Sequence, residues 1–358
     1  MMSRRGIWIG CLVSLIVMAL FVPAAPVMAE GPYKIGAAMR TQTQERWIFD
    51  VASMQTQADE YGDELLVQWA ADDAAKQQQQ VENLISQGID ALILAPVNDV
   101  SAPKMVEIAK EAGIPVIGYD AIIYDADIDY ALQRDAYQAG VWQALGCLLM
   151  HPPNADNPPN VVLIEGDVDY VMGQIWSGAH HDMLDPFDEN GTINIVAAQW
   201  HEEWSGDLAL KTAEAALTAN DDNVQCFVCA NDSMAIGVAQ AIKAGGLEGK
   251  VYLSGIDAQV PNLRLIVEDT QTMSIWTKID QMGQRAVVAA HALAAGEEPP
   301  YDTMLNNRTK DVPTALVEIF DVNKDNMCAW VTGVAPKGWA NAEDIWVDVP
   351  MPDYCKPE

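Results

Sequence analysis

The amino-acid sequence predicts an α/β protein with two lobes, each built on a doubly wound parallel sheet. Three observations lead to this fold class. Short apolar runs, each followed by a helical pattern, recur over most of the chain after residue 29. Repeated strand–helix–strand units require a parallel sheet with helices on both faces. A chain of 358 residues also suits two hydrophobic cores better than one, because a single core stops growing at about 250–300 residues.

The first 29 residues have the pattern of a secretory signal peptide. Arg4 and Arg5 supply the positive start, an apolar run extends from Ile7 to Pro23, and Val27-Met28-Ala29 forms a cleavage site of small residues. No later apolar stretch is long enough to cross a bilayer. We therefore expect export across the cytoplasmic membrane and a mature protein in the periplasm.

The strand-like runs form two series, separated by a loop rich in Pro and Asn at His151–Pro159. The first series is Tyr33–Met39, Glu64–Ala70, Asp90–Ala95 and Pro115–Tyr119, with helical patterns at 43–62, 74–88 and 101–112. The second series is Asn160–Glu165, Ile193–Trp200, Val224–Ala230, Lys250–Gly255 and Gln271–Trp276. Glycines at the helix ends, as in Gln87-Gly88 and Ala112-Gly113, fit the left-handed position that terminates a helix.

The charge balance is strongly acidic. The chain has 51 acidic and 20 basic residues, which gives a formal net charge of −31. Such a chain is repelled by nucleic acid and by anionic lipid, so we expect no nucleic-acid partner. The acidic residues are scattered along the chain, which indicates a solvated surface that maintains solubility.

Five cysteines follow the leader, and export would place them in an oxidising compartment. Cys328 and Cys355 flank a tail that contains Trp and Pro, and we expect a disulfide between them. Cys226 and Cys229 have the spacing of a redox motif, but they lie within a strand-like run and not at a helix start. We therefore expect both to be buried structural residues. The odd count leaves at least one thiol unpaired or paired between chains.

Polar and aromatic side chains gather where the predicted strands end. The groups are Arg40 with Gln44-Glu45-Arg46-Trp47, Tyr119-Asp120, Glu165-Gly166-Asp167, Gln199–Trp204, Ala230-Asn231-Asp232 and Gly255-Ile256-Asp257. Ligands of open α/β sheets bind outside the carboxyl ends of the strands. Carboxylates, amides, guanidinium groups and indoles are the side chains that sugar recognition uses. Taken singly, an Asp or Asn after a strand is often only a helix cap, and a single Trp is more often a core residue.

The chain resembles the type I periplasmic sugar-binding proteins of ABC importers, and most closely their D-xylose-binding branch. The matching stretches are Glu45-Arg46-Trp47, Tyr119-Asp120, Asp125–Asp129, Ala213–Asn220, Asn231-Asp232, Gly255-Ile256-Asp257, Gln271-Thr272-Met273, Leu305-Asn306-Asn307, Lys310–Pro313 and Asp321–Lys324. The resemblance extends from about residue 33 to about residue 326. It implies a periplasmic binding protein of type I, a monomer with two doubly wound parallel-sheet lobes joined by a three-segment hinge.

The resemblance also implies the domain boundaries. It places crossovers near 133–135, 275–278 and 313–316. The N-terminal lobe is then 30–133 plus 278–313, the C-terminal lobe is 134–277 plus 314–326, and residues 327–358 form a C-terminal extension. We expect this extension to strap over the second lobe, and a surface that contacts a partner is the alternative.

The resemblance assigns ligand contacts to positions at the strand ends. They are Arg46, Trp47, Asp120, Trp204, Asn231 and Asp257, with Trp47 and Trp204 on the two faces of a sugar ring. By the same alignment, Thr277, Lys278 and Met172 are further candidate ligand contacts, although three positions depart from the D-xylose-binding pattern. Ala121 stands where that branch has Arg, Thr277 with Lys278 next to it stands at a family Lys, and Met172 falls near a family Asn. Lost donors of this kind cost about 1–3 kcal/mol each when a sugar hydroxyl is buried without a partner.

The resemblance implies a binding protein that captures a monosaccharide, such as the pentose xylose, in a cleft between the lobes and delivers it to a membrane permease. A different polyol, a deoxy sugar or another small ligand is the alternative, as is a sensor that presents its ligand to a membrane receptor. An exported enzyme is disfavoured, because no nucleophile–base arrangement or Gly-x-Ser-x-Gly motif is found. The adjacent His180 and His181 face different directions on a helix and make a poor metal pair. We expect no catalytic residue, metal or cofactor.

Overall fold

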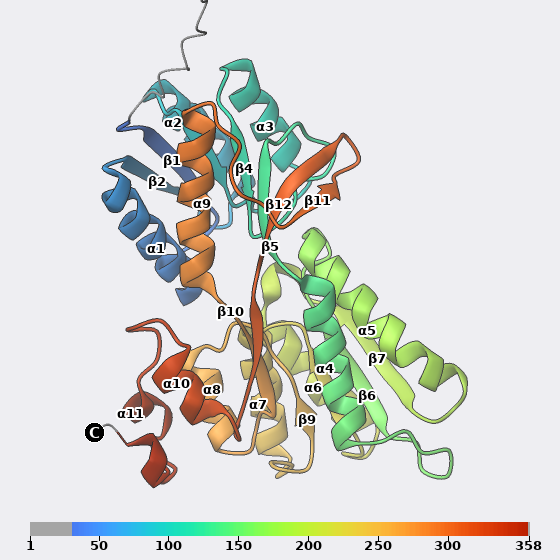
Figure 1. The fold of residues 1–358 in the computed structure, drawn as a ribbon. Coiled ribbons are helices and arrows are strands. Elements are labelled where there is room, and N and C mark those ends of the chain that lie inside the picture. The colour runs from blue at the N-terminus through green and yellow to red at the C-terminus, as the bar shows by residue number, and fades with distance from the viewer. Residues whose placement is uncertain (1–30, 357–358) are drawn as a thin grey trace, which may run out of the picture. The chain divides into compact units, whose positions relative to one another are not determined.

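The computed structural model describes residues 31–356, so the predicted leader, residues 1–29, lies outside the described residues. The chain forms a seven-stranded sheet, a four-stranded sheet and a two-stranded sheet, with helices packed against them (Figure 1). The predicted α/β class with two mainly parallel sheets is confirmed. Within residues 31–356, no helix is long and apolar enough to cross a membrane.

The first sheet has helices on both of its faces. Its strand order is β11-β12-β5-β4-β3-β1-β2, and all neighbours are parallel except β11 and β12. Along β1, Ile35 and Met39 pack on the side of α1 and α9, whereas Ala38 packs on the side of α2 and α3, as the two-residue period of a strand requires. The elements are β1 (Lys34–Met39), α1 (Glu45–Tyr61), β2 (Glu64–Trp69), α2 (Ala74–Ser86), β3 (Ala91–Leu94), α3 (Ala102–Glu111), β4 (Val116–Tyr119), β5 (Tyr130–Arg134), α9 (Ile279–Ala294), β11 (Thr303–Asn306) and β12 (Asp311–Val317).

The second sheet is parallel and has the order β7-β6-β8-β9. The sequence predicted a fifth parallel strand at Gln271–Trp276. That run instead forms β10, which pairs antiparallel with β13 in the two-stranded sheet. The elements are α4 (Ala136–Met150), β6 (Asn160–Glu165), α5 (Val171–Glu189), β7 (Asn194–Trp200), the 3-10 turn η1 (Glu202–Trp204), α6 (Gly206–Ala219), β8 (Cys226–Cys229), α7 (Asp232–Ala244), β9 (Tyr252–Leu253), α8 (Val260–Val267), β10 (Met273–Thr277) and β13 (Ile319–Asn323).

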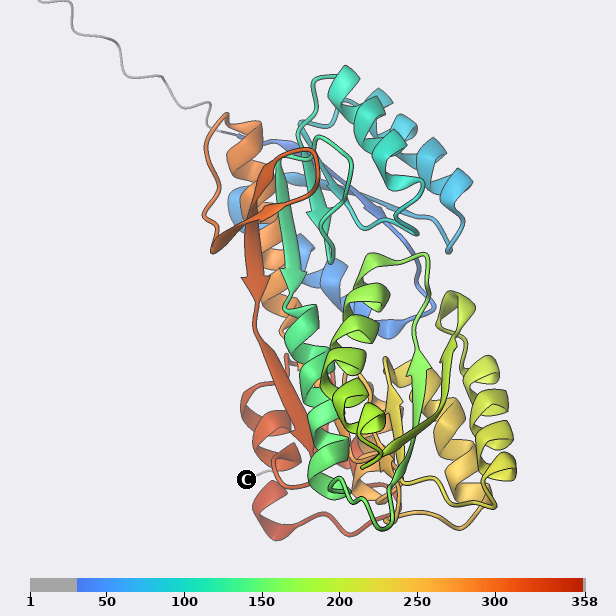
Figure 2. The same cartoon turned by 90° about the vertical axis from the view of Figure 1, so that its right-hand side faces the viewer.

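The chain crosses three times between the part of the structure built on the seven-stranded sheet and the part that contains the four-stranded and two-stranded sheets. β5 runs into α4 at Arg134, β10 runs into α9 at Lys278, and β12 runs into β13 across Glu318. Figure 2 shows the first and third passages side by side. The third passage lies a few residues beyond the predicted 313–316, because β12 continues to pair with β5 up to Val317.

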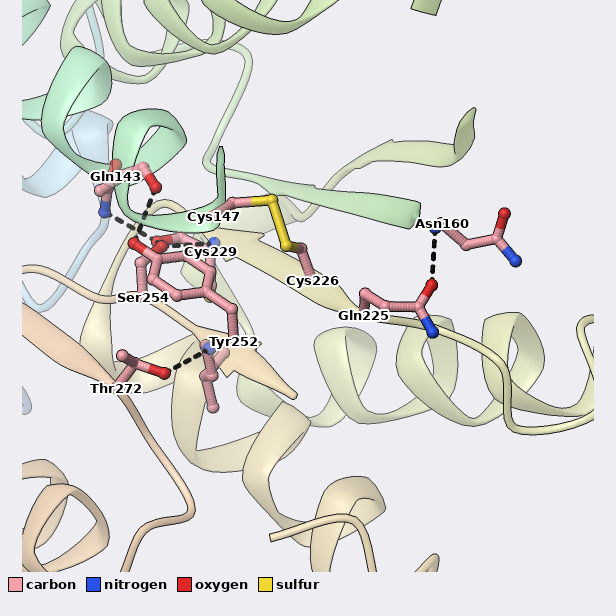
Figure 3. The surroundings of a disulfide bond; sticks show 10 residues. Gln143, Cys147, Asn160, Gln225, Cys226, Cys229, Tyr252, Ser254 and Thr272 are labelled. Atoms are coloured by element: carbon pink, nitrogen blue, oxygen red, sulfur yellow. Dashed lines mark hydrogen bonds between the residues drawn. A yellow bond between two sulfur atoms is a disulfide. The ribbon is translucent and has the colours of Figure 1, made fainter. Parts of the chain in front are cut away.

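Two disulfides are present within residues 31–356. Cys328 pairs with Cys355, as predicted, and Cys147 of α4 pairs with Cys226 of β8 across a separation of 79 residues. Around the second bond, Tyr252 donates its hydroxyl to the Gln143 carbonyl at 2.7 Å (Figure 3). Cys229 is fully buried and unpaired, so the CxxC pair is structural, as the sequence indicated.

The C-terminal extension packs in a hydrophobic cluster with α8 and β10. Trp330, Trp339 and Ile345 are buried against Leu263 and Trp276. It also contacts the first sheet's helices, because Phe49 of α1 packs edge-on against Trp339 at a centroid distance of 5.0 Å. The extension consists of α10 (Met327–Gly333), α11 (Ala342–Ile345) and the 3-10 turn η2 (Asp353–Cys355).

Candidate ligand-binding site

Strand ends from the first and second sheets meet around one small cavity of about 30 Å³. Six of the residues that sequence reasoning proposed line it together, and five others join them. The lining is Arg40, Gln44, Arg46, Trp47, Asp120, Arg134, Tyr170, Trp176, Trp204, Asn231 and Asp257. The parallel strands aim their carboxyl ends at this point, which is where open α/β sheets place their ligands.

Asp120 follows β4 and is the most heavily bonded acceptor of the cavity. Arg46 donates to it at 3.0 Å, Arg134 donates at 2.8 Å, and the Tyr170 hydroxyl donates at 3.2 Å. Burial acts to raise the pKa of this carboxyl, but Arg134 and Arg46 hold the pKa below its ordinary value. Asp120 is therefore a carboxylate at any physiological pH.

Asp257 follows β9 and faces the same two guanidinium groups from the second sheet's side. Arg134 donates to it at 3.3 Å, and Arg46 lies 3.7 Å away. Burial raises the pKa of Asp257, and the two arginines only partly offset that effect. Two arginines and two aspartates thus alternate around the cavity, and they link the two sheets.

A further carboxylate, that of Asp50, holds the Nε side of the Arg46 guanidinium. Its Nε donates to Asp50 one helical turn along α1 at 3.2 Å, and Tyr119 donates to Asp50 at 2.7 Å. Burial raises the pKa of Asp50 to about 6, although Arg46 and the Tyr119 hydroxyl act in the other direction. Both ends of the Arg46 guanidinium are therefore held, which leaves the side chain little freedom to move.

Aromatic rings enclose this polar core. The Arg46 guanidinium lies 4.3 Å from the Trp47 ring centroid, and Arg134 lies 5.4 Å from that of Trp176, both distances at which a cation is attracted to the ring face. Trp204 packs edge-on against Trp176 at 5.5 Å. Such indole faces can pack against the C–H groups of a small ligand.

Trp204 reaches the cavity because Gly166 gives it room. Trp204 is the last residue of η1 and has a positive φ of 58°. A Cβ atom on Gly166 would lie 2.2 Å from the Trp204 ring, which is far inside any real contact. Glycine is therefore required at position 166 for the observed placement of the indole.

Asn231 acts as a helix cap and also lines the cavity. Its side-chain oxygen accepts the Met234 N–H at 3.0 Å at the start of α7. This fixes the orientation of the amide and leaves its NH₂ group as the donor available to a ligand. The cap and site interpretations of this residue are compatible.

Three predicted residues are not among those that line the cavity. Met172 is fully buried in the hydrophobic core around the second sheet. Thr277 ends β10 and is buried, and Lys278 precedes α9 at the passage between sheets. They were assigned by matching a family pattern without gaps, and their contact with a ligand stays a prediction.

Sequence reasoning missed Arg134, Tyr170 and Trp176 of the cavity, and it noted Arg40 and Gln44 without assigning them to the site. Ala121, which stands where the D-xylose-binding branch has Arg, is fully buried and has no side-chain donor. Arg134 brings a guanidinium to Asp120 from the end of β5 instead. A charged residue at the end of the short apolar run Tyr130–Leu132 was the available signal.

Two buried donors of the cavity lining have no hydrogen-bond partner among the described residues. They are Nε of Arg134 and Nε1 of Trp176. A buried donor without an acceptor costs free energy, so a ligand oxygen that reached either atom would gain from it. No group of three or more His, Cys, Asp or Glu residues within residues 31–356 is arranged to hold a metal ion.

Known proteins are similar to this chain in sequence and in fold. The D-xylose-binding periplasmic protein of Escherichia coli is 36% identical over 82% of this chain and 88% of its own length, and its counterpart from Haemophilus influenzae is 33% identical over 82% and 87%. The crystal structure of an ABC transporter solute-binding protein from Clostridium phytofermentans with bound β-D-glucose matches with a TM-score of 0.78 and 25% identity, over 87% of this chain and 99% of that one. Residues 35–298 match the family described as periplasmic binding protein domain. The chain belongs to the periplasmic binding protein family, as the resemblance along its sequence implied.

Proposed function

We propose that this protein is the solute-binding component of an ABC importer and that it captures a monosaccharide, such as the pentose xylose, in the cavity between the sheets. Proteins of its family bind ligands and are not enzymes. The observation that carries the proposal is the alternation of two arginines and two aspartates between indole rings. The two relatives at 33–36% identity are named as D-xylose-binding proteins, which supports a sugar, and xylose in particular, as the ligand.

The chemistry of the cavity suits adjacent hydroxyl groups. A sugar hydroxyl both donates and accepts, so it can donate to Asp120 or Asp257 and accept from a guanidinium. The unpartnered Nε of Arg134 and Nε1 of Trp176 supply two further donors. Together they replace the hydrogen-bonding capacity that Ala121 lacks.

Binding in this arrangement is coupled to closure of the two lobes. A cavity of about 30 Å³ has room for little more than a water molecule, so a sugar must replace some of the arginine–aspartate contacts that span it. Ligand that contacts both sides favours the closed state over the open one. A permease in the membrane would then recognise the closed protein, which the leader would deliver to the periplasm.

A ligand panel tests the proposal. We expect D-xylose to raise the melting temperature of the protein expressed without residues 1–29, and a ligand at 100 times its Kd adds about 2.7 kcal/mol of stability. The panel includes D-ribose, L-arabinose, D-glucose, a deoxy sugar and xylitol, with isothermal titration of each hit. A response to another sugar alone would retain the monosaccharide and reject xylose. No response to any sugar would contradict the proposal.

A further inference from the structure

We propose that the C-terminal extension, residues 327–358, positions Asp257 for ligand binding, through a hydrogen bond from Trp339 to the backbone next to Asp257. This inference rests on the proposed function, because it takes Asp257 as a ligand contact. The extension lies beyond residues 35–298, which carry the family match.

The backbone at Asp257 adopts an unusual conformation. Asp257 has a φ of 105° and Ala258 has a φ of 47°, and side-chain-bearing residues rarely adopt such angles. This turn directs the Asp257 carboxylate towards Arg134. Two consecutive residues of this kind persist only where surrounding contacts hold them.

Hydrogen bonds hold the turn on both sides of Ala258. Its N–H donates to the Ser274 hydroxyl at 2.9 Å, and its carbonyl accepts the indole N–H of Trp339 at 2.9 Å. The Asp257 N–H donates to the Ile275 carbonyl at 2.8 Å. Of these three bonds, the one from Trp339 comes from outside β10 and is the extension's contribution.

Trp339 also contacts the elements around the passage between sheets. Its ring lies 4.7 Å from that of Trp276 in β10 and 5.0 Å from that of Phe49 in α1. Phe49 lies two residues after Trp47 of the cavity lining. One buried indole thus connects the Asp257 turn, the β10 strand and the helix that carries Arg46.

The extension is anchored independently of this contact. The Cys328–Cys355 disulfide closes it on itself, and Arg264 of α8 donates to the Asp344 carbonyl at 2.6 Å. Loss of the Trp339 hydrogen bond alone should therefore leave the extension in place. Its effect on Asp257 can then be measured separately.

The chain offers a matched control. Trp330 lies in the same cluster and is as buried as Trp339, at 4% against 3% exposure, but its Nε1 has no hydrogen-bond partner among the described residues. Trp339→Phe and Trp330→Phe each remove one indole N–H from the same environment. Only the first removes a hydrogen bond to the Asp257 turn.

Two measurements on the two variants test the inference. Hydrogen exchange of the peptide 255–260 in ligand-free protein should be faster in Trp339→Phe and unchanged in Trp330→Phe. Titration with the panel sugar that binds wild type most tightly, D-xylose first, should show a Kd weakened roughly tenfold in Trp339→Phe and within about twofold in Trp330→Phe. In an Asp257→Asn background, Trp339→Phe should add little, because coupled residues are not additive.

The outcomes separate this inference from the proposed function. Equal effects of the two Trp variants on exchange and on Kd would overturn the positioning role and leave the extension as a general stabiliser. Full additivity with Asp257→Asn would overturn it as well. Absence of sugar binding by the wild-type protein contradicts the proposed function instead, and the exchange measurement then still decides whether Trp339 holds the turn.

Discussion

At the scale of single residues, Asp120 and Asp257 face the same two guanidinium groups, yet their pKa values move in opposite directions. Asp120 accepts close bonds from both arginines and from Tyr170, and its pKa is lowered. Asp257 has longer contacts, and burial raises its pKa. Asp120 is therefore the fixed anchor of the network, and Asp257 is the partner more easily released to a ligand.

The packing of Trp204 on Gly166 gives a prediction at the same scale. Gly166→Ala should displace the indole, since the added Cβ would lie 2.2 Å from the ring, and should weaken sugar binding by at least about tenfold through the lost contact. Isothermal titration measures the change. Gly178→Ala in α5 is the control, because its Cβ would meet nothing within 4 Å. An unchanged Kd in Gly166→Ala would remove Trp204 from the site.

At the scale of elements, β5 shows where sequence reasoning succeeded and where it stopped. Apolar runs bounded by turns located eight strands of the two main sheets. Six of them are buried along all or nearly all of their length, whereas β2 and β7, at the edges of their sheets, are half-buried or exposed. The sequence Tyr-Ala-Leu-Gln-Arg of β5 was not recognised as a strand. The buried side chains of Gln133 and Arg134 form hydrogen bonds with the Ile122 N–H and the Asp257 carboxylate. Asp257 lies 123 residues from Arg134 in the sequence, so no local pattern marks Arg134 as a buried strand residue.

The same limit applies to the candidate site. Arg46, Trp47, Asp120, Asn231 and Asp257 could be proposed because each follows a recognisable strand. Trp176 could not, since an aromatic residue inside an amphipathic helix is usually part of the core. Only the three-dimensional arrangement shows that it faces Arg134.

Arg134 gives the prediction that belongs to β5. Arg134→Gln should weaken sugar binding at least tenfold, because it removes the donors to Asp120 and Asp257 and leaves both carboxylates less compensated. Arg308→Gln, which removes an exposed ion pair with Asp125, should leave the Kd unchanged. The contrary result, equal Kd values for the two variants, would reduce Arg134 to a structural residue. Titration of both proteins at one pH decides between these outcomes.

At the scale of the whole molecule, a second contact joins the two main lobes outside the cavity. Asp99, in the loop after β3, accepts the N–H of Val171 at the start of α5, and its own N–H donates to the Asp169 carbonyl at 3.3 Å. Burial raises the pKa of Asp99 to about 6. The Val171 bond and Arg40 act against this rise, and Asp167 and Asp169 add to it.

This contact predicts a pH dependence of closure. The pKa of Asp99 is about 6 when the carboxyl is buried in the contact, and the pKa of an exposed Asp is about 3.9. The protonated carboxyl therefore stabilises the contact fully below about pH 3.9, and this contribution is lost as the pH rises through about 6. Sugar binding should therefore tighten from pH 7 to pH 5, by at most about tenfold. Asp99→Asn, which stays neutral and can still accept the Val171 N–H, should show a flatter dependence. Identical pH profiles for the two proteins would exclude Asp99 as the cause.

The Cys147–Cys226 bond has a consequence for how the protein matures. Cys147 and Cys226 are 79 residues apart in the sequence, and Cys229 lies three residues after Cys226 as a competing thiol. Burial raises the pKa of Cys229 strongly in the finished fold, so its thiol is inert once β8 has formed. Correct oxidation therefore requires that Cys147 pair with Cys226 and not with Cys229.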